Sequence, residues 1–307
     1  MTAPGLRERL SGGEVVLLDG GLATELEAQG HDLTSSLWSA RLLADAPDAI
    51  VAAHAAFFAA GAEVATTASY QASFTGLAAA GVGRAETARL LRRSVTLAER
   101  ARDEAGQPER YVAASVGPYG AARADGSEYR GDYGLSVNKL RAWHRPRLEV
   151  LADTAADVLA CETVPCLAEV EALVAELSRL GRPAWLSITC ADGRTRAGEP
   201  VEEAFALAGS VDEVVAVGVN CLAPAEVESL VAVAAAASGR PVVAYPNRGE
   251  TWDAAQRRWS GPASFPVDAA AGWVAAGARL VGGCCRVAPA DIGALGAALK
   301  PEQALLA

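Results

Sequence analysis

Short runs of consecutive apolar residues alternate along this chain with longer amphipathic or alanine-rich segments. The apolar runs span residues 15–18, 64–67, 111–116, 157–161, 184–189, 214–219, 241–245 and 279–281. Within each run the hydrophobicity is continuous rather than alternating, which is typical of parallel strands buried on both faces. The pattern therefore predicts eight parallel strands.

Helical patterns fill the intervals between these runs. The clearest span residues 47–60, 84–105, 140–153, 165–180, 224–237 and 267–276. Three have a proline in the first turn, where its missing N–H is not needed, and several end on glycine. Strands that each precede a helix imply a parallel sheet, and closure into a (β/α)₈ (TIM) barrel is the simplest arrangement.

The length of 307 residues suits one such barrel, which usually takes about 250 residues, so we expect a single domain over residues 1–307. An open doubly wound sheet is the alternative. No G-x-G-x-x-G motif follows the first strand, which argues against a dinucleotide site.

The net charge of −10 disfavours nucleic-acid binding, which needs a basic surface. No apolar signal segment or membrane span is evident, so we expect a cytoplasmic protein that does not enter a membrane. In that compartment the six cysteines are expected to be reduced, as core residues, metal ligands or nucleophiles. The sequence makes no prediction of oligomeric state.

Polar and thiol groups gather where the predicted strands end, and in a barrel these carboxyl ends form the active site. Asp19 follows the first strand, Glu162 the fourth, and Asn220 and Cys221 the sixth. The eighth ends in Gly282-Gly283-Cys284-Cys285. The long irregular stretches 117–136 and 247–266 also follow strands, so both are expected over the barrel mouth.

The thiols predict a metal site. Cys221 and Cys284 are 63 residues apart, too far for a zinc finger, but a barrel places their two strands on either side of the seventh. Gly282-Gly283 allows the sharp turn that two adjacent cysteine ligands need. Three thiolates favour zinc and leave its fourth position open. Two alternatives remain: ordinary buried thiols, or a closed structural site with Cys161, Cys166 or Cys190 as fourth ligand.

Asp19 and Glu162 are candidates to hold the amino group of a small zwitterion, although Asp19 is equally suited to cap a turn with Gly20-Gly21. Three tyrosines are candidates either to line a pocket or to pack: Tyr70, Tyr119 and Tyr245. The three histidines lie away from the strand ends and are expected to be surface or packing residues: His31, His54 and His144.

Several motifs together resemble the homocysteine S-methyltransferase family. They are Leu18-Asp19-Gly20-Gly21-Leu22-Ala23-Thr24-Glu25-Leu26, Ala68-Ser69-Tyr70-Gln71-Ala72, Ser115-Val116-Gly117-Pro118-Tyr119-Gly120, Gly126-Ser127-Glu128-Tyr129-Arg130-Gly131, Ala160-Cys161-Glu162-Thr163, Gly218-Val219-Asn220-Cys221, Tyr245-Pro246-Asn247 and Gly282-Gly283-Cys284-Cys285-Arg286. The cysteine triad alone is shared with betaine–homocysteine methyltransferase and the homocysteine module of cobalamin-dependent methionine synthase. The third and fourth motifs are more similar to the branch that uses S-methylmethionine.

The resemblance implies a zinc-containing barrel that methylates the thiol of L-homocysteine to give methionine, without cobalamin. The donor would be a sulfonium, either S-methylmethionine or S-adenosylmethionine. It implies that zinc is bound by Cys221, Cys284 and Cys285. It also implies that homocysteine is bound by Asp19, the Gly20 backbone and Glu162, with Tyr70 and Asn220 nearby.

Other functions remain open at this point. Selenohomocysteine or selenocysteine is an alternative acceptor, and betaine an alternative donor. A non-catalytic barrel held together by a structural zinc ion would need four protein ligands. A zinc-dependent aldolase or hydrolase would be expected to place histidine ligands at strand ends, and the sequence has none there.

Overall fold

The computed structural model describes residues 4–33, 38–123, 125–253 and 258–301. Eight strands pair in parallel in the order β1-β12-β9-β8-β5-β4-β3-β2. Their bounds are β1 Val16–Leu17, β2 Val64–Thr66, β3 Tyr111–Val116, β4 Val158–Val164, β5 Ala184–Ile188, β8 Val214–Asn220, β9 Val242–Tyr245 and β12 Ala278–Val281. Each lies on one of the predicted apolar runs, so the eight predicted strands are confirmed.

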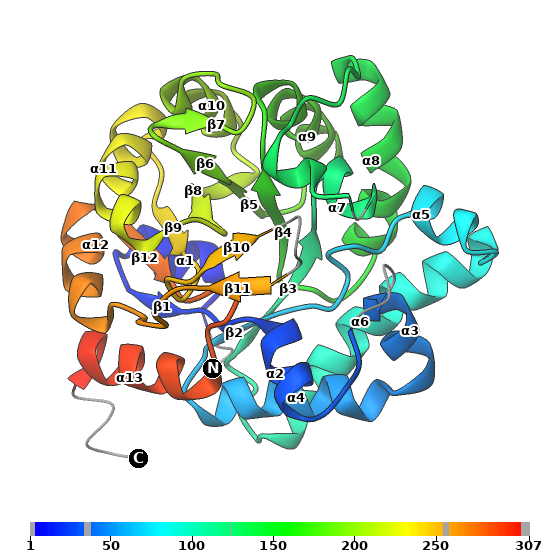
Figure 1. Cartoon of the computed structure of the whole chain (residues 1–307), viewed down its shortest axis with the longest axis horizontal. Coiled ribbons are helices and arrows are strands. Elements are labelled where there is room, and N and C mark those ends of the chain that lie inside the picture. The colour runs from blue at the N-terminus through cyan, green and yellow to red at the C-terminus, as the bar shows by residue number, and fades with distance from the viewer. Residues whose placement is uncertain (1–3, 34–37, 124, 254–257, 302–307) are drawn as a thin grey trace.

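The first and last strands of this order are also joined. Leu18 forms a parallel bridge with Val64, and the Glu63 amide donates to the Leu17 carbonyl at 2.7 Å. The sheet therefore closes on itself, as the view along its axis shows (Figure 1). The predicted (β/α)₈ barrel is confirmed, and the alternative of an open doubly wound sheet is wrong.

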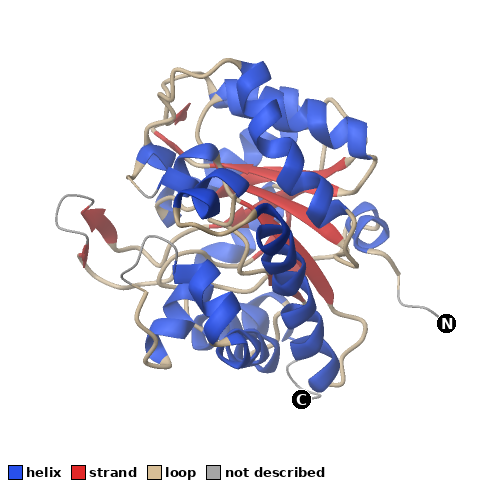
Figure 2. Ribbon diagram, turned by 90° about the vertical axis from the view of Figure 1, so that its right-hand side faces the viewer, coloured by secondary structure: helices blue, strands red, loops and turns tan. Residues whose placement is uncertain are grey.

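Helices surround the strands as an outer layer (Figures 1 and 2). The helices that follow the barrel strands include α4 Pro47–Ala59, α6 Arg84–Glu104, α8 Val137–Ala152, α9 Leu167–Leu180, α10 Val201–Ala208, α11 Val227–Ser238, α12 Ala270–Ala276 and α13 Pro289–Leu299. The six predicted helices all form. The sequence did not single out α10, which has only eight residues, or α13, whose glycines Gly293 and Gly296 lower helix propensity.

The apolar side chains form two separate cores. One lies between the sheet and the helices, and the other fills the barrel interior with residues such as Val16, Val64 and Trp185. Leu6 and Leu10 of the short helix α1 (Leu6–Ser11) belong to the interior core, at the end of the barrel where the strands begin. Polar groups can therefore form a site only at the opposite end.

The two long irregular stretches contain short elements at that opposite end. Residues 117–136 include α7 (Tyr119–Arg123) and the 3₁₀ turn η1 (Ser127–Tyr129). Residues 247–266 include the hairpin β10–β11 (Thr251–Asp253 and Arg258–Ser260), which lies across the barrel in the axial view (Figure 1). None of the described helices is long and apolar enough to cross a bilayer.

Candidate metal centre and active site

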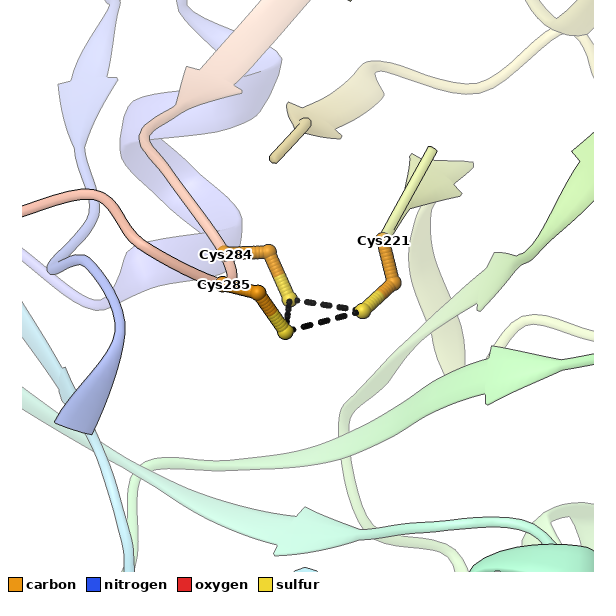
Figure 3. Close-up of side chains that lie close together, drawn as sticks. All are labelled: Cys221, Cys284 and Cys285. Carbon is orange, nitrogen blue, oxygen red and sulfur yellow. Dashed lines mark hydrogen bonds between the residues drawn. The ribbon is translucent and has the colours of Figure 1, made fainter. Parts of the chain in front are cut away.

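Three cysteine thiols meet at the carboxyl ends of two strands. Cys221 follows β8, whereas Cys284 and Cys285 follow β12, and β9 lies between these strands. Their sulfur atoms point toward one another (Figure 3). The Cys284–Cys221 Sγ separation is 3.1 Å, Cys221–Cys285 is 3.5 Å and Cys284–Cys285 is 4.0 Å.

The backbone around these thiols is held by specific contacts. Cys221 has a φ of 57°, and its carbonyl accepts a hydrogen bond from Thr189 Oγ1 at 3.2 Å. The Cys284 amide donates to the Pro246 carbonyl at 2.8 Å. A Cβ at Gly283 would overlap the side chain of Val287. Glycine is required here because the chain must pass Val287 closely to bring both cysteines to the same point.

The spacing of the three sulfur atoms fits a tetrahedral metal ion. A Zn–S bond of about 2.3 Å in a tetrahedron separates the ligand sulfurs by about 3.8 Å, within the 3.1–4.0 Å found here. Among the described residues, this is the one cluster of His, Cys, Asp or Glu ligand atoms close enough to share a metal, and it contains three residues. The other cysteines are buried elsewhere, namely Cys161, Cys166 and Cys190. Within this part of the chain, a fourth cysteine ligand is not supplied.

The three thiols are also hydrogen-bonded to one another. Hydrogen bonds from Cys284 and Cys285 lower the pKa of Cys221 well below its usual value. The pKa values of Cys284 and Cys285 are raised, first of all by their hydrogen bonds with Cys221. A cluster that ionises first at one sulfur and resists further ionisation is suited to bind a cation that displaces the remaining protons.

A cavity of about 360 Å³ opens above the thiols at the barrel mouth. Its walls include Asp19, Gly20, Tyr70 and Glu162 together with all three cysteines. Four of the five residues expected to bind the acceptor therefore line the same cavity as the three thiols. A volume of this size is at the small end of the range for ligand pockets.

The two carboxylates are buried in the cavity wall. Asp19 accepts hydrogen bonds from the Thr66 amide at 2.6 Å and from Thr66 Oγ1 at 2.9 Å. Glu162 accepts from the Ser115 hydroxyl and from the Tyr245 hydroxyl, the latter at 3.1 Å. Burial raises the pKa of Asp19 to about 8 and that of Glu162 to about 7. Both groups would be stabilised as carboxylates by a cation that entered the cavity.

Asn220 does not line the cavity, although it is close to it. Its Oδ1 accepts from the Thr163 amide at 2.7 Å and from Ser187 Oγ at 2.8 Å, while its Nδ2 donates to Thr163 Oγ1 at 2.7 Å. The same Nδ2 lies 4.0 Å from Cys284 Sγ. These contacts fix the end of β8, which carries Cys221, against the end of β4, and suit a positioning role.

Of the three candidate tyrosines, Tyr70 and Tyr245 line the cavity. Tyr119 does not; its ring packs edge-on against Tyr133 and Trp143, with centroids 5.1 and 5.2 Å away. For Tyr119 the packing alternative is therefore correct. None of the three histidines lines the cavity, and His144 is buried against Glu169 at 2.7 Å.

The comparisons with known proteins agree with this geometry. The homocysteine S-methyltransferase family model matches residues 16–299. The homocysteine S-methyltransferase of Escherichia coli is 45% identical and covers 94% of this chain and 97% of its own. The chain belongs to the homocysteine S-methyltransferase family. It is an enzyme of that family, and the resemblance seen in the motifs is confirmed.

Two further relatives and one solved structure are also similar to this chain over most of its length. Homocysteine S-methyltransferase YbgG of Bacillus subtilis is 42% identical, covering 91% of this chain and 92% of its own. A selenocysteine Se-methyltransferase of Brassica oleracea is 39% identical, with coverages of 95% and 91%. The metallated form of the E. coli homocysteine methyltransferase MmuM superposes with a TM-score of 0.85 at 44% identity, covering 95% of this chain and 99% of the other.

Several residues that line the cavity of this family member were not predicted as site residues. Glu128 and Tyr129 lie in η1 and line the cavity, and the Tyr129 hydroxyl is 3.4 Å from Cys221 Sγ. Both belong to the Gly126–Gly131 motif, which was noted for its resemblance but has no strand end to reveal its position. Arg286, Trp259, Thr66 and Ser115 also line the cavity.

Proposed function

We propose that this enzyme transfers a methyl group from a sulfonium donor to the thiol of L-homocysteine, forming methionine, with zinc bound by Cys221, Cys284 and Cys285. The observation that carries the proposal is a cluster of three thiols at the wall of a cavity that also contains two buried carboxylates. The thiols suit a substrate sulfur, and the carboxylates suit a substrate ammonium group. We further propose that residues 1–307 act as one domain and use no cobalamin.

Zinc is the preferred ion because thiolates select soft or borderline metals. When bound, it would supply Lewis acidity that lowers the pKa of a substrate thiol, so that the thiol is ionised near neutral pH. The E. coli relative has been solved in a metallated form, which supports a bound metal in this family.

Asp19 and Glu162 are proposed to bind the ammonium group of homocysteine. Each is buried and already accepts hydrogen bonds from neutral donors, so the added positive charge would find acceptors in fixed positions. Gly20 also lines the cavity, and its backbone is proposed to contact the substrate. Glycine is required there because a Cβ would lie 2.6 Å from the Val287 carbonyl oxygen. Tyr70 forms the adjoining wall.

The methyl transfer is a displacement at carbon. The homocysteine thiolate forms a bond to the donor methyl while the bond from that methyl to the positive donor sulfur breaks. The donor departs as a neutral thioether, so no general acid is needed. The chain contributes by orienting the two sulfur atoms and by excluding water from the cavity.

The size of the cavity favours a compact donor. Homocysteine must share about 360 Å³ with the donor, which suits S-methylmethionine better than the larger S-adenosylmethionine. Betaine remains an alternative donor. A seleno-amino acid remains an alternative acceptor, which the Brassica relative supports by its name.

The test is a donor panel with homocysteine and the zinc-loaded protein, scored by methionine formed. S-methylmethionine is expected to give the highest kcat/KM, followed by S-adenosylmethionine, with no product from betaine or methylfolate. Selenocysteine is assayed in parallel as acceptor. Product from betaine alone, or full activity after complete metal removal, would contradict the proposal.

A further inference from the structure

We propose that Glu128 binds the positive sulfonium of the methyl donor and thereby selects a cationic donor. The proposal rests on the proposed function, because it concerns the second substrate of the same reaction. It assigns to Glu128 a role in specificity that is separate from the acceptor site formed by Asp19 and Glu162.

The local fold directs Glu128 into the cavity. The loop after β3 turns through Gly126, whose φ is 75°, and then forms η1. Gly120 lies so close to the η1 backbone that a Cβ atom there would overlap the Glu128 nitrogen. The Gly131 amide donates to the Ser127 carbonyl at 2.9 Å and closes the turn. The position of Glu128 is thus fixed by backbone packing rather than by a partner for its carboxylate.

The carboxylate of Glu128 has an unsatisfied oxygen. Its Oε2 atom is buried and accepts no hydrogen bond from any residue that the structure describes. Over the same residues, no ion pair to Glu128 is found, and Arg130 lies nearer to Asp132, at 3.5 Å. An unpaired buried carboxylate is costly unless a cation approaches it. A cationic ligand bound in the cavity that Glu128 lines would supply this partner.

The charges around the cavity point to the same ligand. Among the described residues that line it are four carboxylates, from Asp19, Glu27, Glu128 and Glu162, and one guanidinium, from Arg286. Arg286 is itself paired with Glu250 at 3.2 Å. Homocysteine is a zwitterion that becomes an anion once its thiol ionises, so it leaves this acidic surplus unbalanced. A donor with an additional positive charge balances it, whereas betaine is neutral overall and methylfolate is an anion.

Glu128 is also next to the place of reaction. The neighbouring residue, Tyr129, has its hydroxyl 3.4 Å from Cys221 Sγ. The wall formed by Glu128 and Tyr129 therefore borders the thiol cluster to which the acceptor sulfur is proposed to bind. The donor sulfur must lie within a few ångströms of that acceptor, separated from it by the methyl group being transferred.

The reaction removes the charge that Glu128 recognises. The sulfonium is fully positive when bound and becomes a neutral thioether, so a nearby carboxylate stabilises the bound donor more than the transition state. Glu128 is therefore expected to lower the donor KM and to leave kcat unchanged or slightly reduced. This split distinguishes it from a residue that accelerates the chemical step.

The experiment compares the zinc-loaded wild type with Glu128→Gln. The donor KM for S-methylmethionine and for S-adenosylmethionine is expected to rise about tenfold to a hundredfold, with unchanged kcat and homocysteine KM. Asp132→Asn is the matched control. Asp132 lies in the same loop, but its side chain is 72% exposed and is not part of the cavity lining, so less than about a twofold change is expected.

A neutral isostere separates charge recognition from a structural effect. In 2-amino-5-methylhexanoate, a carbon replaces the positive sulfur of S-methylmethionine. Its inhibition constant, measured in competition with the donor, is expected to be the same in wild type and Glu128→Gln. Glu128→Asp should restore most of the donor affinity. Equal losses for the donor and the isostere, or no loss for either, would overturn the proposal. If no sulfonium is a donor for the wild type, the proposed function fails instead.

Discussion

The Tyr129 hydroxyl lies 3.4 Å from Cys221 Sγ and so links the loop after β3 to the thiol cluster beyond β8. The ring of Tyr129 also faces the Arg196 guanidinium, 5.6 Å from its centroid. Burial keeps the pKa of Tyr129 well above its usual value, so its hydroxyl remains protonated and can donate to a cysteine thiolate.

Tyr129→Phe is therefore expected to weaken metal binding without abolishing it. Partners of metal ligands typically contribute 10- to 100-fold in affinity, so zinc affinity should fall about tenfold. Competition with a chromogenic chelator measures this directly. Tyr119→Phe is the control, since Tyr119 packs in the aromatic cluster outside the cavity and should retain wild-type affinity. Equal zinc affinities of Tyr129→Phe and the wild type would show that the Tyr129 hydroxyl does not support metal binding.

Cys285→Ala should lose both the metal and the activity. Two thiolates that remain after the substitution cannot hold zinc in the proposed geometry, so metal analysis should fall from about one zinc per chain to near zero. Cys190→Ala is the matched control because Cys190 is buried but lies outside the cluster. Metal retained at full stoichiometry in Cys285→Ala would show that this residue is not a ligand.

Glu162→Gln tests the proposed ammonium site. A charged hydrogen bond to the substrate is replaced by a neutral one, which should raise the homocysteine KM by about tenfold to a hundredfold while the donor KM stays within about twofold. Steady-state kinetics with each substrate varied in turn provides the measurement. If both KM values rise together, Glu162 supports the fold of the cavity rather than the acceptor.

Glu162 also predicts a pH dependence of stability. Burial raises its pKa to about 7, so the folded protein holds this proton more tightly than the unfolded chain. That contribution is fully present below the unfolded pKa and is lost as the pH rises through 7. Relative to Glu162→Gln in the same metal state, the wild type should lose roughly 1 kcal/mol of unfolding free energy between pH 6 and pH 8. Urea titrations at both pH values measure the difference, and parallel profiles would contradict the assignment.

The sequence predicted the barrel because every buried strand carries a continuous apolar run, from residues 15–18 to residues 279–281. The cluster of three thiols could be predicted because Cys221, Cys284 and Cys285 directly follow such strands. The strand ends thus revealed half of the cavity wall. That all three thiols meet at one point follows from the strand order, in which β9 alone separates β8 from β12. The pattern alone did not establish how closely the three sulfur atoms approach one another.

Other parts of the wall come from loops, where periodicity carries no information. Glu128 enters the cavity only because Gly120 permits close packing of η1. Trp259 enters from β11, within a stretch predicted to be irregular. Tyr119 looked equivalent to Tyr70 in sequence, since both follow strands, yet α7 turns its ring toward Trp143 instead. Such differences depend on how loops pack on one another, and this packing cannot be predicted from short sequence motifs.

Arg147 is expected to be the residue of α8 on which the mouth loops depend most. It is 1% exposed, and its Nη2 donates to the Gly117 carbonyl at 2.6 Å and lies 3.0 Å from His144 Nδ1. Its Nη1 donates to the Tyr70 carbonyl at 3.4 Å, so one side chain joins the loops after β2 and β3. Arg147→Met would leave these buried acceptors without a donor, and about 3 kcal/mol of unfolding free energy should be lost.

Arg145→Met is the matched control on the same helix. Arg145 is 43% exposed and shares Glu176 with Arg141 and Arg179, so its removal should lower the unfolding free energy much less than Arg147→Met does. Urea denaturation of both variants at one pH gives the comparison. Equal losses would mean that the buried hydrogen bonds of Arg147 stabilise the loops no more than a surface ion pair does. A larger loss in Arg147→Met, together with faster proteolysis within residues 117–136, would assign its effect to the loop that carries Glu128 and Tyr129.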